Sequence, residues 1–230
     1  MNSPAPSPES QTQDFIAFML ASGVLKFGSF KTKSGRTSPY FLDAGRYGRG
    51  SQAEKLGSFY AEHLLAHLGG DFDVLFGPAY KGIPLVVATA IALSERGKDV
   101  GFCFNRKEAK DHGEGGVLVG HQLRDGDRVV IVEDVTTAGT SIRETVPLLR
   151  AAAKVELVAL IVSVDRQERG RGEQSALAEI SAEYGFSALS IVNIDQIVEH
   201  LRQHEVDGQK LITPELELAI RDYRRAYGGR

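Results

Sequence analysis

The sequence predicts an α/β domain in which a central parallel sheet is flanked by helices, with a small N-terminal hood subdomain. Three observations lead to this prediction. Short apolar runs alternate with longer helical runs along most of the chain. The short runs are apolar at consecutive positions, which is typical of strands buried on both faces of a parallel sheet. The segment before them is short, aromatic and rich in turn residues, which predicts a separate β-ribbon.

The N-terminal elements follow from local patterns. Residues 1–12 contain three prolines and no apolar segment, which predicts a disordered tail, with one folded domain over residues 13–230. Apolar residues at helical spacing predict a helix from Asp14 onward. The stretch 25–45 predicts the ribbon, with its turn at Ser34 and Gly35.

The alternating part of the chain begins with a helix over residues 51–70, for which Ser51 is a candidate N-cap and Gly69 a stop signal. The predicted strands are 73–77, 100–104, 128–135, 155–165 and 187–194. The predicted helices among them are 83–97, 140–153, 173–185 and 194–204. Ligands bind at the carboxyl ends of the strands in such sheets, so the residues that follow each strand are the candidates for function.

Composition and charge exclude several classes of protein. The formal net charge of −3 provides no global basic field for nucleic acid. No apolar run approaches the roughly 20 residues of a membrane-spanning helix. A single cysteine, Cys103, excludes an intrachain disulfide and a thiolate zinc cluster. One thiol suits a reducing compartment, so we expect a cytoplasmic protein.

The stretch VVIVEDVTTAGTS carries the strongest signal for a ligand. Glu133 and Asp134 stand at the carboxyl end of a strand, and adjacent strand residues point to opposite faces, so we expect them to have different partners. The turn Thr136–Ser141 supplies hydroxyls, a glycine and a helix start, which together suit a phosphate. A ligand with a phosphate and a diol or metal ion would use both parts. The alternative is a strand that ends in a capped helix without any ligand.

This stretch resembles the motif with which type I phosphoribosyltransferases bind 5-phospho-α-D-ribose 1-diphosphate (PRPP). The resemblance implies the fold of that family. It also implies that Glu133 and Asp134 hold the ribose hydroxyls, although many relatives have aspartate where Glu133 stands. The turn would hold the 5′-phosphate through Thr136, Thr137, Ala138, Gly139, Thr140 and Ser141.

The stretch FGPAYKGIP follows the first strand of the sheet. Gly77 and Gly82 have the spacing of a P-loop, but Ile83 stands where that motif requires lysine, which excludes it. Lys81 still suits an anion at the end of a strand. The resemblance implies that Lys81 and Tyr80 bind PRPP or its pyrophosphate, and that the peptide bond between Ala79 and Tyr80 is cis.

Five stretches occur in one chain in the order found in orotate phosphoribosyltransferases, which they resemble. They are KSGRTSPYF, FGPAYKGIP, CFNRKEAKDHGEGG, VEDVTTAGTS and DRQERGRGE. The resemblance implies transfer of phosphoribosyl from PRPP to orotate, giving orotidine 5′-monophosphate for pyrimidine synthesis. It also implies Mg²⁺, bound mainly through the substrate and not by a dedicated set of protein ligands, and a homodimer with active sites shared across the interface.

The resemblance assigns further roles. Lys33 would contact PRPP, and Phe41 and Leu42 would border the orotate ring, with Thr137 as another orotate contact. One loop carries four cationic residues followed by several glycines. These four residues would hold the pyrophosphate when the loop closes. These residues are Arg106, Lys107, Lys110 and His112.

Arg166 has an independent rationale as an orotate contact. It follows an apolar strand, and a guanidinium binds a carboxylate such as that of orotate through two parallel hydrogen bonds. The alternative is a salt bridge within the segment 165–169, which reads DRQER.

Two other functions remain open on the sequence. A phosphoribosyltransferase for another base would share VEDVTTAGTS but lack the ribbon motif and the Arg166 segment. A regulatory module that senses PRPP without turnover would keep the acids and lose the cationic loop. The basic C-terminal stretch YRRAYGGR is short, and we assign it no role in nucleic-acid binding.

Overall fold

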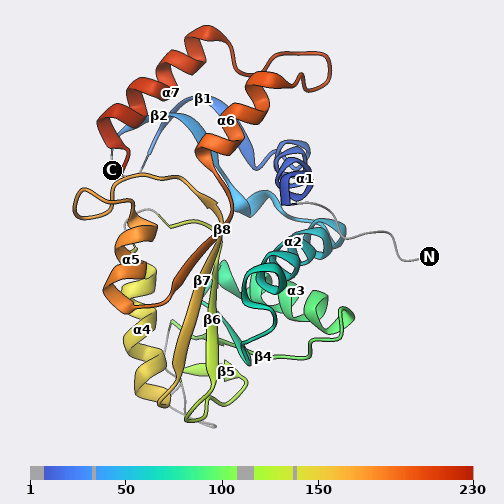
Figure 1. Ribbon diagram of the computed structural model, residues 1–230, viewed down its shortest axis with the longest axis vertical. Helices are drawn as coiled ribbons and strands as arrows, with labels where there is room; N and C mark the ends of the chain where they lie inside the picture. The colour runs from blue at the N-terminus through green and yellow to red at the C-terminus, as the bar shows by residue number, and fades with distance from the viewer. Residues whose placement is uncertain (1–7, 33–34, 108–116, 137–138, 230) are drawn as a thin grey trace.

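The structure is a computed structural model that describes residues 8–32, 35–107, 117–136 and 139–229. A six-stranded sheet with the order β5-β4-β3-β6-β7-β8 forms its centre (Figure 1). All strands are parallel except β5, which runs antiparallel to β4. The strands are β3 (Val74–Gly77), β4 (Gly101–Asn105), β5 (Leu118–Gly120), β6 (Arg128–Glu133), β7 (Glu156–Asp165) and β8 (Ser187–Asn193).

Helices cover both faces of this sheet, as predicted. Alternate residues of β6 belong to two different core clusters: Val130 and Val132 to one, Val129 and Ile131 to the other. The first cluster includes residues of α2 (Gly50–Leu68) and α3 (Gly82–Glu95), and the second includes residues of α4 (Thr140–Ala152) and α5 (Ala176–Tyr184). Figure 1 shows these two pairs of helices on opposite sides of the sheet. A strand buried on both faces explains the continuous apolar sequence.

The predicted ribbon forms a hood over one end of the sheet. It consists of the antiparallel strands β1 (Leu25–Lys31) and β2 (Thr37–Leu42), followed by the 3₁₀ turn Ala44–Arg46. Three helices lie with it at this end: α1 (Pro8–Ala21), α6 (Ile194–Gln203) and α7 (Pro214–Tyr227) (Figure 1). Residues 8–12, which the sequence assigned to a tail, are therefore helical. Proline is well tolerated in the first turn of a helix, and Gln11 donates a hydrogen bond to Glu62 of α2 at 3.3 Å.

Three further details differ from the prediction. The helix predicted from Ser51 begins at Gly50, and its first turn is capped by Gln52, whose side chain accepts from the backbone N–H groups of Gly48 and Arg49. The sequence did not predict β5, which has only three residues. It also missed α7, although the Thr213 cap and the proline after it are a standard helix start.

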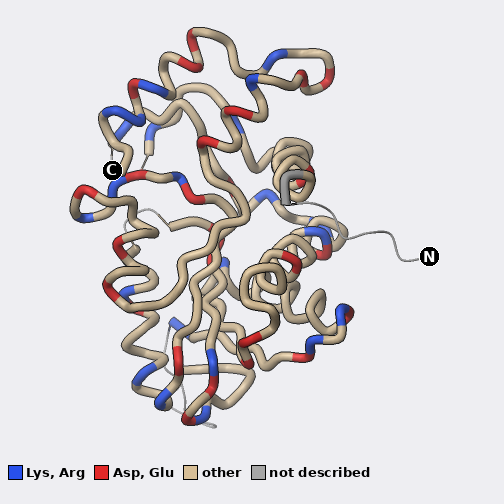
Figure 2. Tube along the Cα trace, in the orientation of Figure 1, with Lys and Arg blue, Asp and Glu red and all other residues tan. Residues whose placement is uncertain are grey.

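The strand order places a switch point between β3 and β6. From β3 the chain continues to β4 on one side, and it then returns to β6 on the other side. The connections that leave β3 and β6 therefore diverge at their carboxyl ends, where ligands bind in open α/β sheets. None of the described helices is long and apolar enough to cross a membrane. Basic and acidic residues are interspersed along the described trace (Figure 2).

Gly57→Ala should lower the free energy of unfolding by about 1–3 kcal/mol through overpacking. A Cβ at Gly57 in α2 would lie 2.4 Å from the carbonyl oxygen of Ala88 in α3. Inside a helix, alanine is intrinsically more favourable than glycine by about 1 kcal/mol. A decrease in the free energy of unfolding of Gly57→Ala would therefore come from packing and not from helix propensity. The control is Gly50→Ala, where a Cβ meets no atom within 4 Å. Thermal unfolding followed by circular dichroism measures both; equal melting temperatures would contradict the close helix contact.

Candidate active site

The backbone at the end of β6 is fixed from two sides. The Tyr60 hydroxyl of α2 donates to the carbonyl of Glu133 at 2.7 Å, and the Ser163 hydroxyl of β7 donates to the carbonyl of Asp134 at 2.6 Å. Both acids are buried, with 7% and 5% of their surface exposed. The strand end that carries them is therefore held rigidly between a helix and a neighbouring strand.

The two carboxylates have different partners, as the alternation of a strand predicts. Asp134 Oδ2 accepts from Lys81 Nζ at 2.8 Å, which links the ends of β6 and β3. Glu133 Oε2 accepts from the Ser141 hydroxyl at 3.2 Å, which links it to the first turn of α4. The acids thus point toward two different loops of the same sheet edge.

Burial and mutual repulsion set the charge of this pair. Burial, reinforced by the charge of Asp134, raises the pKa of Glu133 to about 7. Burial alone would lower the pKa of Lys81, but the hydrogen bond and charge of Asp134 outweigh it and raise the pKa above its usual value. Lys81 therefore stays charged in its ion pair with Asp134, while the pKa of Glu133 lies near neutral pH.

The turn between β6 and α4 has the geometry of a tight helix start. Gly139 caps α4 in the left-handed conformation, with φ of 71°. A Cβ at this position would lie 2.4 Å from Ile180 Cδ1, so glycine is required on both counts. Thr136 is buried, Thr140 and Ser141 begin the helix, and helix starts offer N–H groups to an anion. Thr137 and Ala138 lie outside the described residues.

The loop after β3 is the second wall of the site. Its Ala79–Tyr80 peptide bond is cis, as the resemblance implied. The Ala79 N–H donates to Asn105 Oδ1 at the end of β4 at 2.8 Å, which fixes the loop. Tyr80 is 66% exposed, and Lys107 Nζ lies 5.3 Å from its ring centroid, within cation–π range.

The strand ends meet at a pocket of about 240 Å³, lined in part by Lys81 and Asp134. Ala44, Tyr47 and Leu85 also line it. Arg106 and Lys107 begin the cationic loop, and the Arg106 N–H donates to the carbonyl of Val117. The predicted loop residues Lys110 and His112 lie outside the described part of the chain, as does Lys33 in the ribbon.

Phe41 and Leu42, which the resemblance places beside the orotate ring, lie in strand β2 of the hood. Phe41 is 37% exposed and stacks on Phe30, with ring centroids 5.5 Å apart, whereas Leu42 is buried in the core. The ribbon thus offers an apolar ring face in Phe41, while Leu42 serves to anchor the strand.

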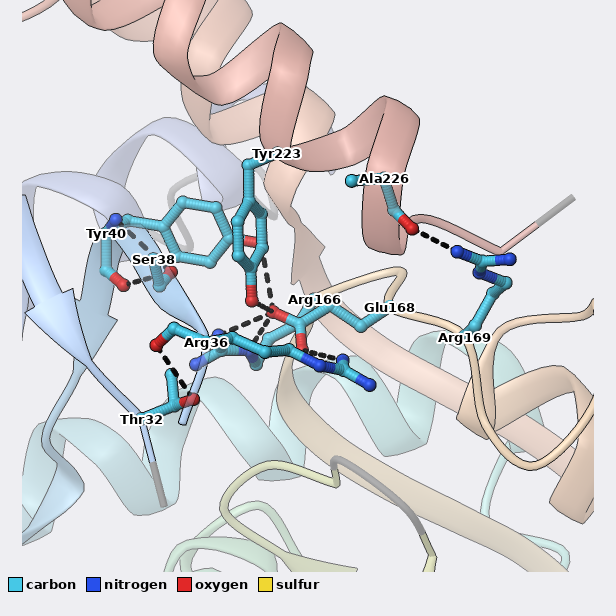
Figure 3. Close-up of polar contacts among 9 residues, drawn as sticks. All are labelled: Thr32, Arg36, Ser38, Tyr40, Arg166, Glu168, Arg169, Tyr223 and Ala226. Atoms are coloured by element: carbon cyan, nitrogen blue, oxygen red, sulfur yellow. Dashed lines mark hydrogen bonds and ion pairs between the residues drawn. The ribbon is translucent and has the colours of Figure 1, made fainter. Parts of the chain in front are cut away.

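Arg166 is buried directly after β7. Its Nε and Nη2 donate to Glu168 Oε1 at 2.9 and 2.5 Å, and its guanidinium lies 5.0 Å from the ring centroid of Tyr40 (Figure 3). The salt bridge within residues 165–169, which the sequence left as the alternative, is therefore present. It does not exclude ligand binding, because Nη1 has no hydrogen-bond partner among the described residues.

Comparison with known proteins shows the family to which this chain is related. The chain matches the model of the phosphoribosyl transferase domain over residues 43–183. It is 54% identical over 219 residues to the orotate phosphoribosyltransferase of Clostridium beijerinckii, covering 95% of this chain and 98% of that protein. The crystal structure of orotate phosphoribosyltransferase from Francisella tularensis aligns with a TM-score of 0.81 at 35% identity, covering 94% of this chain and 100% of that one.

The raised pKa of Glu133 makes stability depend on pH. Between about pH 4.5 and 7, the native state keeps this proton while the unfolded chain loses it, so the free energy of unfolding falls as the pH rises. The stability is fully present below this window, and the loss is on the order of 3 kcal/mol. Glu133→Gln should flatten this slope in urea unfolding, whereas Glu144→Gln, at an exposed position of α4, should not. An unchanged slope in Glu133→Gln would contradict the assignment.

Proposed function

Because the chain belongs to the orotate phosphoribosyltransferase family, we propose that it transfers the phosphoribosyl group of PRPP to orotate. The products are orotidine 5′-monophosphate and pyrophosphate, on the route to pyrimidine nucleotides. The observation that carries this proposal is the grouping at one sheet edge of a carboxylate pair, a phosphate-type turn and a buried arginine. These three features match the diol, the phosphate and the carboxylate of the two substrates.

The ribose phosphate fits the end of β6. Glu133 and Asp134 accept hydrogen bonds from the ribose hydroxyls, and the turn from Thr136 to Ser141 surrounds the 5′-phosphate. The phosphate gains N–H donors and the positive end of the α4 dipole. A carboxylate accepts from a diol best when it is ionised, so PRPP binding would favour the ionised form of Glu133.

The diphosphate fits the neighbouring loop. Lys81 is 59% exposed at its side chain and lies at the carboxyl end of β3, so it can reach a ligand without leaving Asp134. Lys33, Arg106, Lys107, Lys110 and His112 supply further positive charge from the ribbon and the cationic loop. Positive charge placed around the leaving group stabilises the transition state more than the substrate.

The orotate ring fits between the hood and β7. Phe41 offers an apolar face, Thr137 a hydroxyl, and Arg166 a guanidinium for the carboxylate. This placement favours orotate over bases that lack a carboxylate, because only a carboxylate can form a charge-assisted pair of hydrogen bonds with the edge of the guanidinium that Glu168 leaves open.

Mg²⁺ belongs to the proposal as the cofactor that accompanies PRPP. Glu133 and Asp134 are oxygen ligands of the kind it prefers, and Mg²⁺ is commonly held by one or two carboxylates together with substrate phosphates. When bound, it would neutralise charge on the departing diphosphate. Most of its ligands would be oxygens of the substrate.

The chemistry needs positioning and charge more than a nucleophilic side chain. The bond from ribose C1 to the diphosphate oxygen breaks, with its electron pair leaving on pyrophosphate. A bond from C1 to orotate N1 forms as N1 gives up its proton, which leaves with pyrophosphate. An oxocarbenium-like ribose arises between these events. The residues above hold both reactants in line, and closure of the cationic loop excludes the water that would hydrolyse PRPP.

We also propose a homodimer with shared active sites. An apolar groove of about 490 Å³ runs along α2 and α3, and Ile91 on its wall is 57% exposed. Pro84 and Ala88 line both this groove and the pocket of Lys81 and Asp134. A second copy seated in the groove would therefore border the active site.

The expected location is the cytosol. Cys103 is the single cysteine of the chain, and burial, followed by the charge of Asp127, raises the pKa of its thiol to about 12. Such a thiol is a packing residue that suits a reducing compartment.

The reaction itself is tested by the absorbance of orotate. We expect it to fall only when the protein, PRPP and Mg²⁺ are all present, with pyrophosphate as co-product. Adenine and hypoxanthine in place of orotate should give no nucleotide. Consumption of a purine would indicate a transferase for another base, and tight PRPP binding without any turnover would indicate a sensing module.

Ile91→Arg should dissociate the dimer, because it places a charge in an apolar interface. The molar mass from light scattering should fall to that of one chain, and activity should fall with it. Leu218→Arg is the matched control, since Leu218 is 54% exposed on α7, away from the groove. A dimer that persists in Ile91→Arg at low protein concentration would rule out this interface.

A further inference from the structure

The carboxylate of Glu168 joins side chains from parts of the chain far apart in sequence (Figure 3). Besides Arg166, the hydroxyls of Tyr223 in α7 and Tyr40 in β2 donate to its Oε1, at 3.0 and 3.3 Å. Arg36, at the start of β2, places Nη1 3.9 Å from Oε2. Glu168 is only 8% exposed, so this charge is held by protein groups more than by water.

The two tyrosines fix the orientation of this carboxylate. Burial first, and then the charge of Glu168, raise the pKa of Tyr40 and of Tyr223. Both hydroxyls therefore stay protonated and remain donors at neutral pH. Their rings meet edge to face, with centroids 5.8 Å apart, so each also restrains the other.

The fixed carboxylate in turn orients Arg166. One edge of the guanidinium, Nε and Nη2, lies on Glu168 and its face lies over Tyr40. The other edge, Nη1 with Nη2, is left for a planar anion. The group formed by Arg36, Arg166 and Glu168 has a net charge of one positive unit. A single ligand carboxylate would neutralise it.

The C-terminal helix is tied to the same loop by its backbone. The Arg169 N–H donates to the carbonyl of Tyr227 at 2.8 Å, and the Gly229 N–H donates to the carbonyl of Gln167 at 2.9 Å. Since these bonds flank Glu168, the loop and the end of α7 form one unit. Tyr223 is therefore held in a constant position relative to Glu168.

We propose that Glu168 and Tyr223 are positioning residues that hold Arg166 in the orientation that binds the carboxylate of orotate. This proposal rests on the proposed function, because it assumes that Arg166 binds orotate. It gives α7, at the far end of the chain, a role in recognition of the base and none in recognition of PRPP.

The test compares steady-state constants of five full-length variants: Glu168→Gln, Tyr223→Phe, Tyr227→Phe, Arg166→Ala, and Arg166→Ala combined with Tyr223→Phe. Glu168→Gln puts an amide N–H₂ against one of the two arginines and leaves buried positive charge unpaired, so Arg166 turns away. We expect KM for orotate to rise about tenfold, and about threefold in Tyr223→Phe, with KM for PRPP unchanged. Tyr227→Phe removes a hydroxyl from the same helix but keeps the ring beneath Arg36, and should match the wild type.

The double variant separates positioning from general damage. In an Arg166→Ala background, Tyr223→Phe should add nothing further to KM for orotate, because the residue that it positions is gone. Equal effects of Tyr223→Phe in both backgrounds, an unchanged KM for orotate in Tyr223→Phe, or equal rises in both KM values would overturn the proposal. If Glu168→Gln does not fold, Tyr223→Phe, which retains every charge, decides alone. A wild type that consumes no orotate would overturn the proposed function, and this inference with it.

Discussion

The ion pair between Lys81 and Asp134 is the interaction on which the site depends. It joins the ends of β3 and β6, two strands whose connections leave in opposite directions. The pair exists only in one register, in which Leu75 lies beside Val130 and Phe76 beside Ile131. A slip of one residue would send the Asp134 side chain to the other face of the sheet and bury Glu133 against the wrong helices. The continuous apolar strands thus fix the chemistry as well as the core.

Charge at the carboxyl edge is arranged in two separate cation–carboxylate pairs. Lys81 with Asp134 lies at β3 and β6, and Arg166 with Glu168 lies after β7. Each pair spares the protein the cost of an uncompensated buried charge. Glu133 is different, because its partner is the neutral hydroxyl of Ser141 and its nearest charge is repulsive. Burial and this repulsion raise the pKa of Glu133 to about 7, so its charge is sensitive to its surroundings near neutral pH.

The sequence predicted the residues at strand ends well, because a buried strand followed by polar residues has a single plausible geometry at a sheet edge. The structure has Glu133, Asp134, Lys81 and Arg166 at the strand ends where this pattern places them, and their roles toward a ligand stay predictions. The contribution of Tyr40 and Tyr223 could not be predicted, since their hydroxyls meet Glu168 only through the packing of a ribbon against a C-terminal helix. The pKa of Glu133 was equally hidden, because it follows from burial by α2 and α4 and not from local sequence. The start of α7 carried a readable signal, Thr213 before a proline, that was overlooked.

The two ion pairs differ in exposure, and this difference determines what an anionic ligand does at each. The Lys81 side chain is 59% exposed, so a diphosphate could contact it directly. Lys81 would have to keep its bond to Asp134, because that side chain is only 7% exposed and would otherwise carry a buried, unpaired charge. The Arg166 side chain is 8% exposed, and breaking a buried pair costs about 3–5 kcal/mol. A carboxylate that displaced Glu168 would gain little over the partner it removed. If orotate binds Arg166 as proposed, it would therefore add to the pair at the remaining edge of the guanidinium, which would make the fixed orientation of Arg166 more important than its charge.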